Sequence, residues 1–292
     1  MRQASQYAVF FLLLVATACQ PALDDPEATL KIPATVPDFA LEPKAPSLTQ
    51  RATELADEAT VALAKNDVKQ AIPLLTEALA IDVSHERARW LLARTFAQAG
   101  RASVALRLFE PLAKHLHDCG WCLETLQNVQ KDSTFARLVA SKEGHALLEK
   151  VPTTPLPYQT WAQTLAKQIQ TGKLEEVGKF ANAHRPFELV RACPGCTDPQ
   201  KRLPQHRQFT GSPLLIKVAS RFDLTRPENY GMPLQITGDP QCTERCCHWP
   251  IAQSIQAGTA ALQEICLRPD TPTQPSVTRM SLIFGPGTVT AH

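Results

Sequence analysis

The densest group of chemically reactive side chains lies between Gln241 and Pro250, in the stretch QCTERCCHWP. Three cysteines, a histidine and a tryptophan fall within ten residues. Thiols and an imidazole at this density can attach a haem, bind a metal ion or form disulfides. The compartment decides among these outcomes, because an oxidising compartment converts thiol pairs into disulfides.

Two interpretations make this stretch a cofactor site. Cys242, Cys247 and His248 give a C-x4-C-H pattern, a spacing variant of the C-x-x-C-H signature of c-type haem attachment. Cys242, Cys246, Cys247 and His248 supply the donor set of a zinc site with three cysteines and one histidine. Adjacent Cys246 and Cys247 would point to opposite faces of a strand, which argues against their sharing one ion. We predict neither a metal nor a cofactor, and haem and zinc stay as alternatives.

The N-terminus indicates the compartment. Arg2 precedes an unbroken apolar run, Ala8–Ala16, which is shorter than the about 20 residues of a membrane-spanning helix and has the length of a signal-peptide core. The residues VATAC, ending at Cys19, resemble the lipobox of bacterial lipoproteins, although Ala16 stands where leucine is commonest. The resemblance implies a removed signal peptide at 1–18, lipidation of Cys19 and, with Gln20 next, a lipid anchor in the outer membrane.

Eight cysteines remain after Cys19, and an even number in an exported protein favours disulfides. The Pro-Gly centre of CPGC suits a type II turn, so a local bond between Cys193 and Cys196 is geometrically reasonable. Cys119 and Cys122 have the C-x-x-C spacing of thiol oxidoreductases. They lie between predicted helices rather than in a strand–helix unit, so we predict a stapled or free pair there.

Cys266 completes the set, in the predicted strand LQEICL. If Cys246 and Cys247 point to opposite faces, one of them can reach Cys266 while the other reaches Cys242. The sequence leaves open which of the two bonds each forms. All eight cysteines are therefore disulfide candidates: Cys119, Cys122, Cys193, Cys196, Cys242, Cys246, Cys247 and Cys266.

The elements that would position these residues begin after a proline-rich segment. Six prolines lie between Gln20 and Ser47, and proline fixes φ and donates no backbone hydrogen bond. We predict that residues 19–47 are a lipidated, extended linker.

Residues 48–150 show apolar residues at helical spacing and an internal repeat. Ala59, Asn66, Ala71, Leu75 and Ala78 recur 34 residues later as Ala93, Gly100, Ala105, Phe109 and Leu112. This period resembles that of tetratricopeptide repeats, which are helix–turn–helix units. A third, degenerate copy is expected to start near Gly120 and to cap the stack. Pro73 and Pro111 should bend the second helices or delay their starts.

Residues 151–292 change character after the boundary segment VPTTPLP. Two predicted helices are followed by the short β-rich runs FELVRAC, LLIKVAS, PLQITGD, LQEICL and VTRMSLIFG. Helices followed by such strands predict a small α+β domain with an antiparallel sheet. The order faintly resembles nuclear-transport-factor-like domains. The fold class expected for the whole chain is α+β, with an all-α repeat domain first.

The net charge and the absence of known catalytic motifs limit the classes of function that the sequence supports. The net charge of +2 gives no electrostatic footprint for nucleic acid. The chain lacks the H-E-x-x-H, G-x-S-x-G, phosphate-loop, dinucleotide and calcium-loop motifs, so we assign no catalytic residue and predict a protein that is not an enzyme. Stacked helical repeats form extended binding surfaces. We expect an envelope scaffold that binds a protein or peptide partner, with a thiol-redox or haem- or zinc-binding protein as the alternative.

Overall fold

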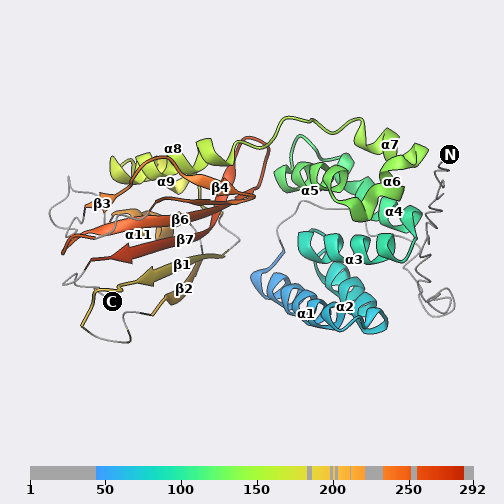
Figure 1. Cartoon of the computed structure of the whole chain (residues 1–292), viewed down its shortest axis with the longest axis horizontal. Helices are drawn as coiled ribbons and strands as arrows, with labels where there is room; N and C mark the ends of the chain where they lie inside the picture. Colours follow the sequence, from blue (N-terminus) through green and yellow to red (C-terminus); the bar gives the residue numbers. More distant parts are fainter. Residues whose placement is uncertain are drawn as a thin grey trace, which may run out of the picture. The chain divides into compact units, whose positions relative to one another are not determined.

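The computed structural model describes residues 44–182, 186–197, 200, 203–210, 212–220, 233–250 and 255–285 (Figure 1). The predicted signal peptide, Cys19 and almost all of the predicted linker lie outside these residues. Within these described ranges, no helix combines the length and the apolar character that a bilayer crossing requires.

The first two repeats are helix pairs. They comprise α1 (Pro46–Ala64) with α2 (Val68–Ile81), and α3 (Glu86–Gln98) with α4 (Ala102–Ala113). Asn66 and Gly100 occupy equivalent positions between the helices of each pair, and both have left-handed backbones with φ of +57° and +79°. Asn and Gly tolerate this conformation best, which explains why these two types recur at the repeat spacing. Asp67 caps α2, accepting a 3.0 Å hydrogen bond from the amide of Gln70.

Small residues let the paired helices pack closely. Ala59, Ala71, Ala93 and Ala105 are completely buried, and the larger Leu75 and Phe109 at the next repeat position fill the remaining space. The residues that recur at the 34-residue spacing are therefore the ones that pack between the paired helices.

Three local expectations need adjustment. Pro46, assigned to the linker, begins α1, where a fixed φ and a missing N–H are tolerated. α2 begins at Val68 and runs through Pro73, and α4 begins at Ala102 and runs through Pro111, so neither helix starts late, and the alternative of a bend stays a prediction. Each proline lies on a helix that also packs against α3, and tertiary packing outweighs the lost hydrogen bond.

The third repeat begins where the period places it and then departs from the pattern. α5 (Gly120–Lys131) is a full helix, but its partner is divided into the 3₁₀ turn Ser133–Phe135, α6 (Ala136–Ala140) and α7 (Lys142–Leu148). Ser141 ends α6 and caps α7, accepting a 3.0 Å hydrogen bond from the amide of Gly144. A Cβ at Gly144 would lie 1.9 Å from the Leu138 carbonyl oxygen, so only glycine fits this break.

A mixed sheet follows, preceded by α8 (Tyr158–Gln170) and α9 (Leu174–Gly178). Its strands are β1 (Pro186–Ala192), β2 (Gln205–Thr210), β3 (Leu234–Gln235), β4 (Gln241–Thr243), β5 (Cys246–His248), β6 (Ala260–Pro269) and β7 (Pro275–Phe284). The order is β2-β1-β7-β6-β5-β4, with β3 also beside β6. The α+β class is confirmed. The sheet is not purely antiparallel, because β1 pairs with β7, and β3 with β6, in parallel.

The core of this region lies between the sheet and the helices. Trp161, Leu165 and Ile169 of α8 share one buried cluster with Ile265 of β6 and Leu282 of β7. α8 contacts β4, β5 and β6, and α9 contacts α11 (Ser212–Ser220). One face of the sheet is therefore covered by helices.

One predicted strand is a helix. The run LLIKVAS forms most of α11, in which Leu215, Val218 and Ala219 are buried while Lys217 is exposed. This burial repeats at helical spacing, and a short apolar run cannot be assigned from its composition alone. The prediction missed β2, β4 and β5, of which β4 and β5 have three residues each.

Candidate functional site

The stretch with the three cysteines folds into a β-hairpin. β4 and β5 pair antiparallel, with Cys242 opposite Cys247 and Thr243 opposite Cys246. Glu244 and Arg245 form the two-residue turn, and Glu244 has a φ of +54°. Tight hairpins require such a conformation, which asparagine or glycine usually supplies. We call residues Gln241–His248 the Arg245 hairpin.

Two disulfides hold this hairpin. Cys242 is bonded to Cys247 within it, and Cys246 is bonded to Cys266 of the neighbouring strand β6. The structure thereby makes the choice that the sequence left open. Cys246 and Cys247 point to opposite faces, Cys247 into the core with no exposed surface and Cys246 to the other face. A backbone hydrogen bond of 2.8 Å from Leu267 to the Arg245 carbonyl adds a further link to β6.

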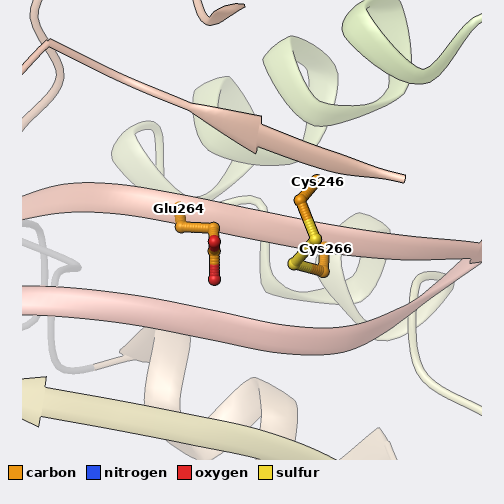
Figure 2. A group of neighbouring side chains, drawn as sticks. All are labelled: Cys246, Glu264 and Cys266. Carbon is orange, nitrogen blue, oxygen red and sulfur yellow. A yellow bond between two sulfur atoms is a disulfide. The ribbon is translucent and has the colours of Figure 1, made fainter. Parts of the chain in front are cut away.

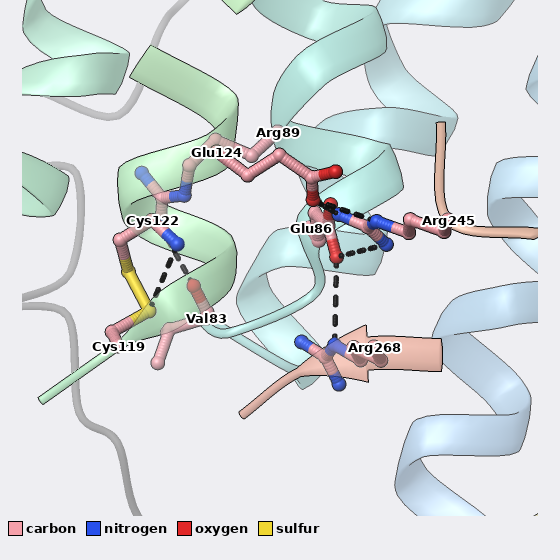
Figure 3. Close-up of a disulfide and its surroundings, with 8 residues drawn as sticks. All are labelled: Val83, Glu86, Arg89, Cys119, Cys122, Glu124, Arg245 and Arg268. Carbon is pink, nitrogen blue, oxygen red and sulfur yellow. Dashed lines mark hydrogen bonds and ion pairs between the residues drawn. A yellow bond between two sulfur atoms is a disulfide. The ribbon is translucent and has the colours of Figure 1, made fainter. Parts of the chain in front are cut away.

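The guanidinium of Arg245 lies between two glutamates of the helical repeats (Figure 3). Its Nε donates a 2.6 Å hydrogen bond to Glu124 of α5, and its Nη1 donates a 3.3 Å hydrogen bond to Glu86 of α3. Its Nη2 donates to both carboxylates. A planar guanidinium can bridge two carboxylates in this way, whereas a lysine ammonium offers no fixed fork of donors.

Tyr158 and Arg268 extend the same cluster. The Tyr158 hydroxyl donates a 2.8 Å hydrogen bond to Glu124. Arg268 of β6 lies with its Nε 3.6 Å from Glu86 and its guanidinium 5.5 Å from the Trp121 ring centroid. Both glutamates, which lie on helices of the repeats, therefore contact side chains from residues 151–292.

The segment CGWC at the start of α5 also meets the sheet region. The Gly120 amide donates a 3.1 Å hydrogen bond to the carbonyl of Asp270. A Cβ at Gly120 would lie 2.5 Å from the Thr271 carbonyl oxygen, so any other residue would force the backbones apart. Cys119 and Cys122 are joined by a disulfide and have no exposed surface. Complete burial opposes the thiolate exchange that an oxidoreductase requires.

The other disulfide and the two cofactor alternatives are settled by the same structure. Cys193 and Cys196 form the local disulfide of the CPGC turn. Cys242 and Cys247 are bonded to each other, so the haem pattern would need this bond to break. The zinc alternative of Cys242, Cys246, Cys247 and His248 is divided between two faces, because Cys246 and His248 share the face opposite that of Cys247.

Burial and neighbouring charges shift the pKa values of three side chains in the repeats and the cluster around Arg245. Burial alone would lower the pKa of Arg245, but the charges of Glu86 and Glu124 outweigh it and raise this pKa well above its usual value. Burial, followed by the charge of Glu124, raises the pKa of Tyr158, which keeps its hydroxyl protonated as a donor. Burial lowers the pKa of Arg89 to about 10. The Arg89 guanidinium donates to the carbonyls of Val83 and Leu108, at 2.7 and 2.9 Å.

A second polar group lies on the first helices of the repeats. Arg87 of α3 contacts Asp57 at 2.5 Å and Thr60 at 3.0 Å, both on α1. His85, the N-cap residue of α3, lies 3.1 Å from the hydroxyl of Thr53 on α1. The Arg87 and Asp57 side chains are 49% and 58% exposed, so they remain accessible to another molecule. We call these five residues the first-helix row.

Sequence reasoning missed the acidic pair and its arginine. Glu86 and Glu124 carry no motif, and their partner Arg245 lies 159 and 121 residues away. The available signal was the tight spacing between Cys242 and Cys247, which places a two-residue turn at Glu244–Arg245. Nothing in that spacing indicates what the turn contacts.

The comparisons with known proteins agree with the helical part of this description. A family model described as tetratricopeptide repeat matches residues 62–120, which run from the end of α1 to the start of α5. No curated protein and no solved structure shows significant similarity to the chain. The resemblance of residues 151–292 to nuclear-transport-factor-like domains stays a prediction. The chain thus contains tetratricopeptide-like helical repeats, followed by a sheet region.

Proposed function

We propose that this protein is a lipid-anchored scaffold of the bacterial cell envelope that binds a protein or peptide partner through its helical repeats. The observation that carries the proposal is the pair of matched repeats α1–α2 and α3–α4. Repeats of this kind present the same helix from each unit along one continuous surface.

The first-helix row is the part of that surface best suited to a partner. It carries an exposed acid and two hydroxyls on α1 and an exposed base on α3, so two adjacent repeats contribute to it. Exposed ion pairs contribute little to stability, about 0–1 kcal/mol. These groups can therefore exchange their contacts for those of a partner at small cost to the fold.

Charge exchange within the row tests the proposal. Asp57→Lys breaks the contact with Arg87, whereas the double variant Asp57→Lys/Arg87→Glu restores an ion pair of reversed direction. In-cell crosslinking should recover a partner with the wild type and lose it with both variants, because the partner meets reversed charges. Glu77→Lys, the same change at an exposed position of α2, is the matched control and should keep the partner. An identical crosslinking pattern in all four proteins would show that this row does not bind the partner.

The lipid anchor is tested separately. Cys19→Ser should abolish incorporation of a labelled fatty acid and move the protein from the outer-membrane fraction to the soluble periplasmic fraction. Acyl chains supply about 0.8 kcal/mol for each buried methylene, so losing them removes the membrane affinity. Equal labelling of the variant and the wild type would refute lipidation at this cysteine.

A further inference from the structure

Four potential metal ligands face the same side of strands β5 and β6. Cys246 and His248 are two residues apart on β5, and Glu264 and Cys266 are two residues apart on β6. The register places Cys246 opposite Cys266 and His248 opposite Glu264. Residues two apart on a strand share one face, and directly opposed residues are close neighbours on it. The four side chains therefore form a two-by-two group, which Figure 2 shows in part.

Three of the four side chains, Cys246, Glu264 and Cys266, have ligand atoms close enough for a single small cation, and His248 reaches this group through its contact with Glu264. The sulfurs of Cys246 and Cys266 and a carboxylate oxygen of Glu264 all lie within 4.8 Å of one another. The Nδ1 atom of His248 lies 3.3 Å from Oε2 of Glu264. Zinc takes four such ligands in a tetrahedron, with bonds of about 2.0–2.3 Å to oxygen, nitrogen and sulfur.

Neighbouring residues already orient the carboxylate. The Arg279 Nε donates a 2.7 Å hydrogen bond to Oε1 of Glu264, and the Ser281 hydroxyl lies 3.3 Å from the same oxygen. The other oxygen, Oε2, faces His248 and also accepts a 3.5 Å hydrogen bond from the Arg279 Nη2. Outer hydrogen bonds of this kind fix the direction of a metal ligand. Two thiolates and one carboxylate would also balance the charges of a divalent cation and Arg279.

In the structure, Cys246 and Cys266 are bonded to each other (Figure 2). We propose that reduction of this bond converts Cys246, His248, Glu264 and Cys266 into a site for Zn²⁺. A dithiol reductant donates two electrons and two protons, the S–S bond breaks, two thiols form and the reductant leaves as its own disulfide. The cation then displaces the two thiol protons to solvent. In either state β5 remains linked to β6, and Arg245 stays at the end of the hairpin.

This set differs from the one that the sequence suggested. Cys242 and Cys247 are replaced by Glu264 and Cys266, because only the latter lie on the same face as Cys246 and His248. The sequence could not have indicated Glu264, since its place opposite His248 depends on the strand register.

Cobalt titration of the full chain, reduced with a phosphine, tests the proposal. Co²⁺ bound by thiolates in a tetrahedral site gives intense charge-transfer absorption and visible bands that zinc then removes. The difference between the wild type and Cys246→Ser/Cys266→Ser isolates this site from the other cysteine pairs. We expect the wild type to bind one more Co²⁺ ion than this variant, and Cys242→Ser/Cys247→Ser to retain that ion.

Histidine variants test the non-sulfur ligands. His248→Ala should weaken Co²⁺ binding at this site by more than the about 10- to 100-fold that follows loss of an outer partner. His206→Ala is the matched control, because His206 also pairs with a glutamate, Glu188 at 2.7 Å, in the same sheet, and it should leave the titration unchanged. Equal Co²⁺ binding by the wild type and Cys246→Ser/Cys266→Ser would overturn the site, as would equal affinities of the two histidine variants. Loss of the circular dichroism spectrum on reduction, without recovery on adding Co²⁺, would also overturn it.

Discussion

Arg245 and Glu124 lie 121 residues apart in the chain, yet the Nε of Arg245 donates a 2.6 Å hydrogen bond to the Glu124 carboxylate. The arginine is at the tip of a disulfide-linked hairpin, and the glutamate is on the first helix of the third repeat. Glu86 of the second repeat receives two further hydrogen bonds from the same guanidinium. This contact links the sheet region to two repeats through one side chain.

A double-mutant cycle on this pair should reveal strong coupling. Arg245→Ala leaves Glu124 without its main counter-charge, and Glu124→Gln removes the charge while keeping the shape. We expect a coupling free energy of about 0.5–3 kcal/mol between the two substitutions, the range found within one hydrogen-bonded network. Urea denaturation of the four proteins measures it. Additive effects, within about 0.5 kcal/mol, would mean that the two side chains are not energetically coupled.

Gly120→Ala should be far more damaging than an ordinary glycine substitution in a helix. Its Cβ would meet backbone oxygens of Thr271 and Pro269 at 2.5 and 2.7 Å, and backbone cannot move aside as a side-chain end can. We expect a loss of about 1–3 kcal/mol in unfolding free energy. Gly178→Ala is the matched control, since its Cβ would meet only the flexible end of Ile216 at 3.0 Å. Similar unfolding free energies for both variants would contradict the close approach.

The cap of α3 should make stability depend on pH. The Nδ1 of His85 accepts a 3.2 Å hydrogen bond from the amide of Ala88, which requires a neutral ring. Burial lowers the pKa of His85 below its ordinary value of 6.5, although Asp82 opposes this and Arg268 and Arg87 assist it. The unfolded chain therefore binds the proton more readily. The contribution is complete above pH 6.5 and is lost as the pH falls below that value.

The variant His85→Asn separates this effect from other titrations. Asparagine also caps helices but does not titrate, so its unfolding free energy should fall less than that of the wild type between pH 7.5 and about pH 5. His85→Ala should cost about 0.5–2 kcal/mol at neutral pH through loss of the cap. If the unfolding free energies of the wild type and His85→Asn fall equally over this pH range, the pH dependence comes from other groups.

The disulfides should differ in their contributions to stability. Cys246–Cys266 spans 20 residues and Cys119–Cys122 spans three. Closing the longer loop removes more conformational entropy from the unfolded chain, so Cys246→Ala/Cys266→Ala should cost about 3 kcal/mol. Cys119→Ala/Cys122→Ala should cost less through this entropic effect. Thermal unfolding of both variants under oxidising conditions compares them, and a greater loss for the shorter loop would show that packing of the buried sulfurs dominates.

The helical repeats were predictable because their determinants are local and recur. The alanines that pack between helices and the left-handed positions Asn66 and Gly100 all reappear at the 34-residue spacing. β6 and β7 were also predictable, since each is ten residues long and rich in apolar residues. The α11 segment was assigned wrongly because the run LLIKVAS is too short for its periodicity to separate a helix from a strand.

The contacts of the candidate site could not be predicted from the sequence. Arg245 meets its glutamates only after the sheet has formed and β5 has taken its register on β6. The disulfide partners of Cys246 and Cys247 depend on the same register, which the sequence reduced to two choices. Glu264 could not be assigned to the proposed metal site from the sequence, because its place beside His248 depends on the same strand register.

The hairpin also sets the minimum affinity that another molecule would need in order to bind Glu86 and Glu124. Arg245 is attached to the same chain as Glu86 and Glu124, so it competes as an intramolecular ligand. A group held in place by the same chain has a high effective concentration at its partner, because no second molecule has to be captured. A free peptide that used its own arginine to displace Arg245 would need an affinity high enough to overcome that local concentration. A basic peptide of low affinity therefore cannot displace Arg245 from the two glutamates.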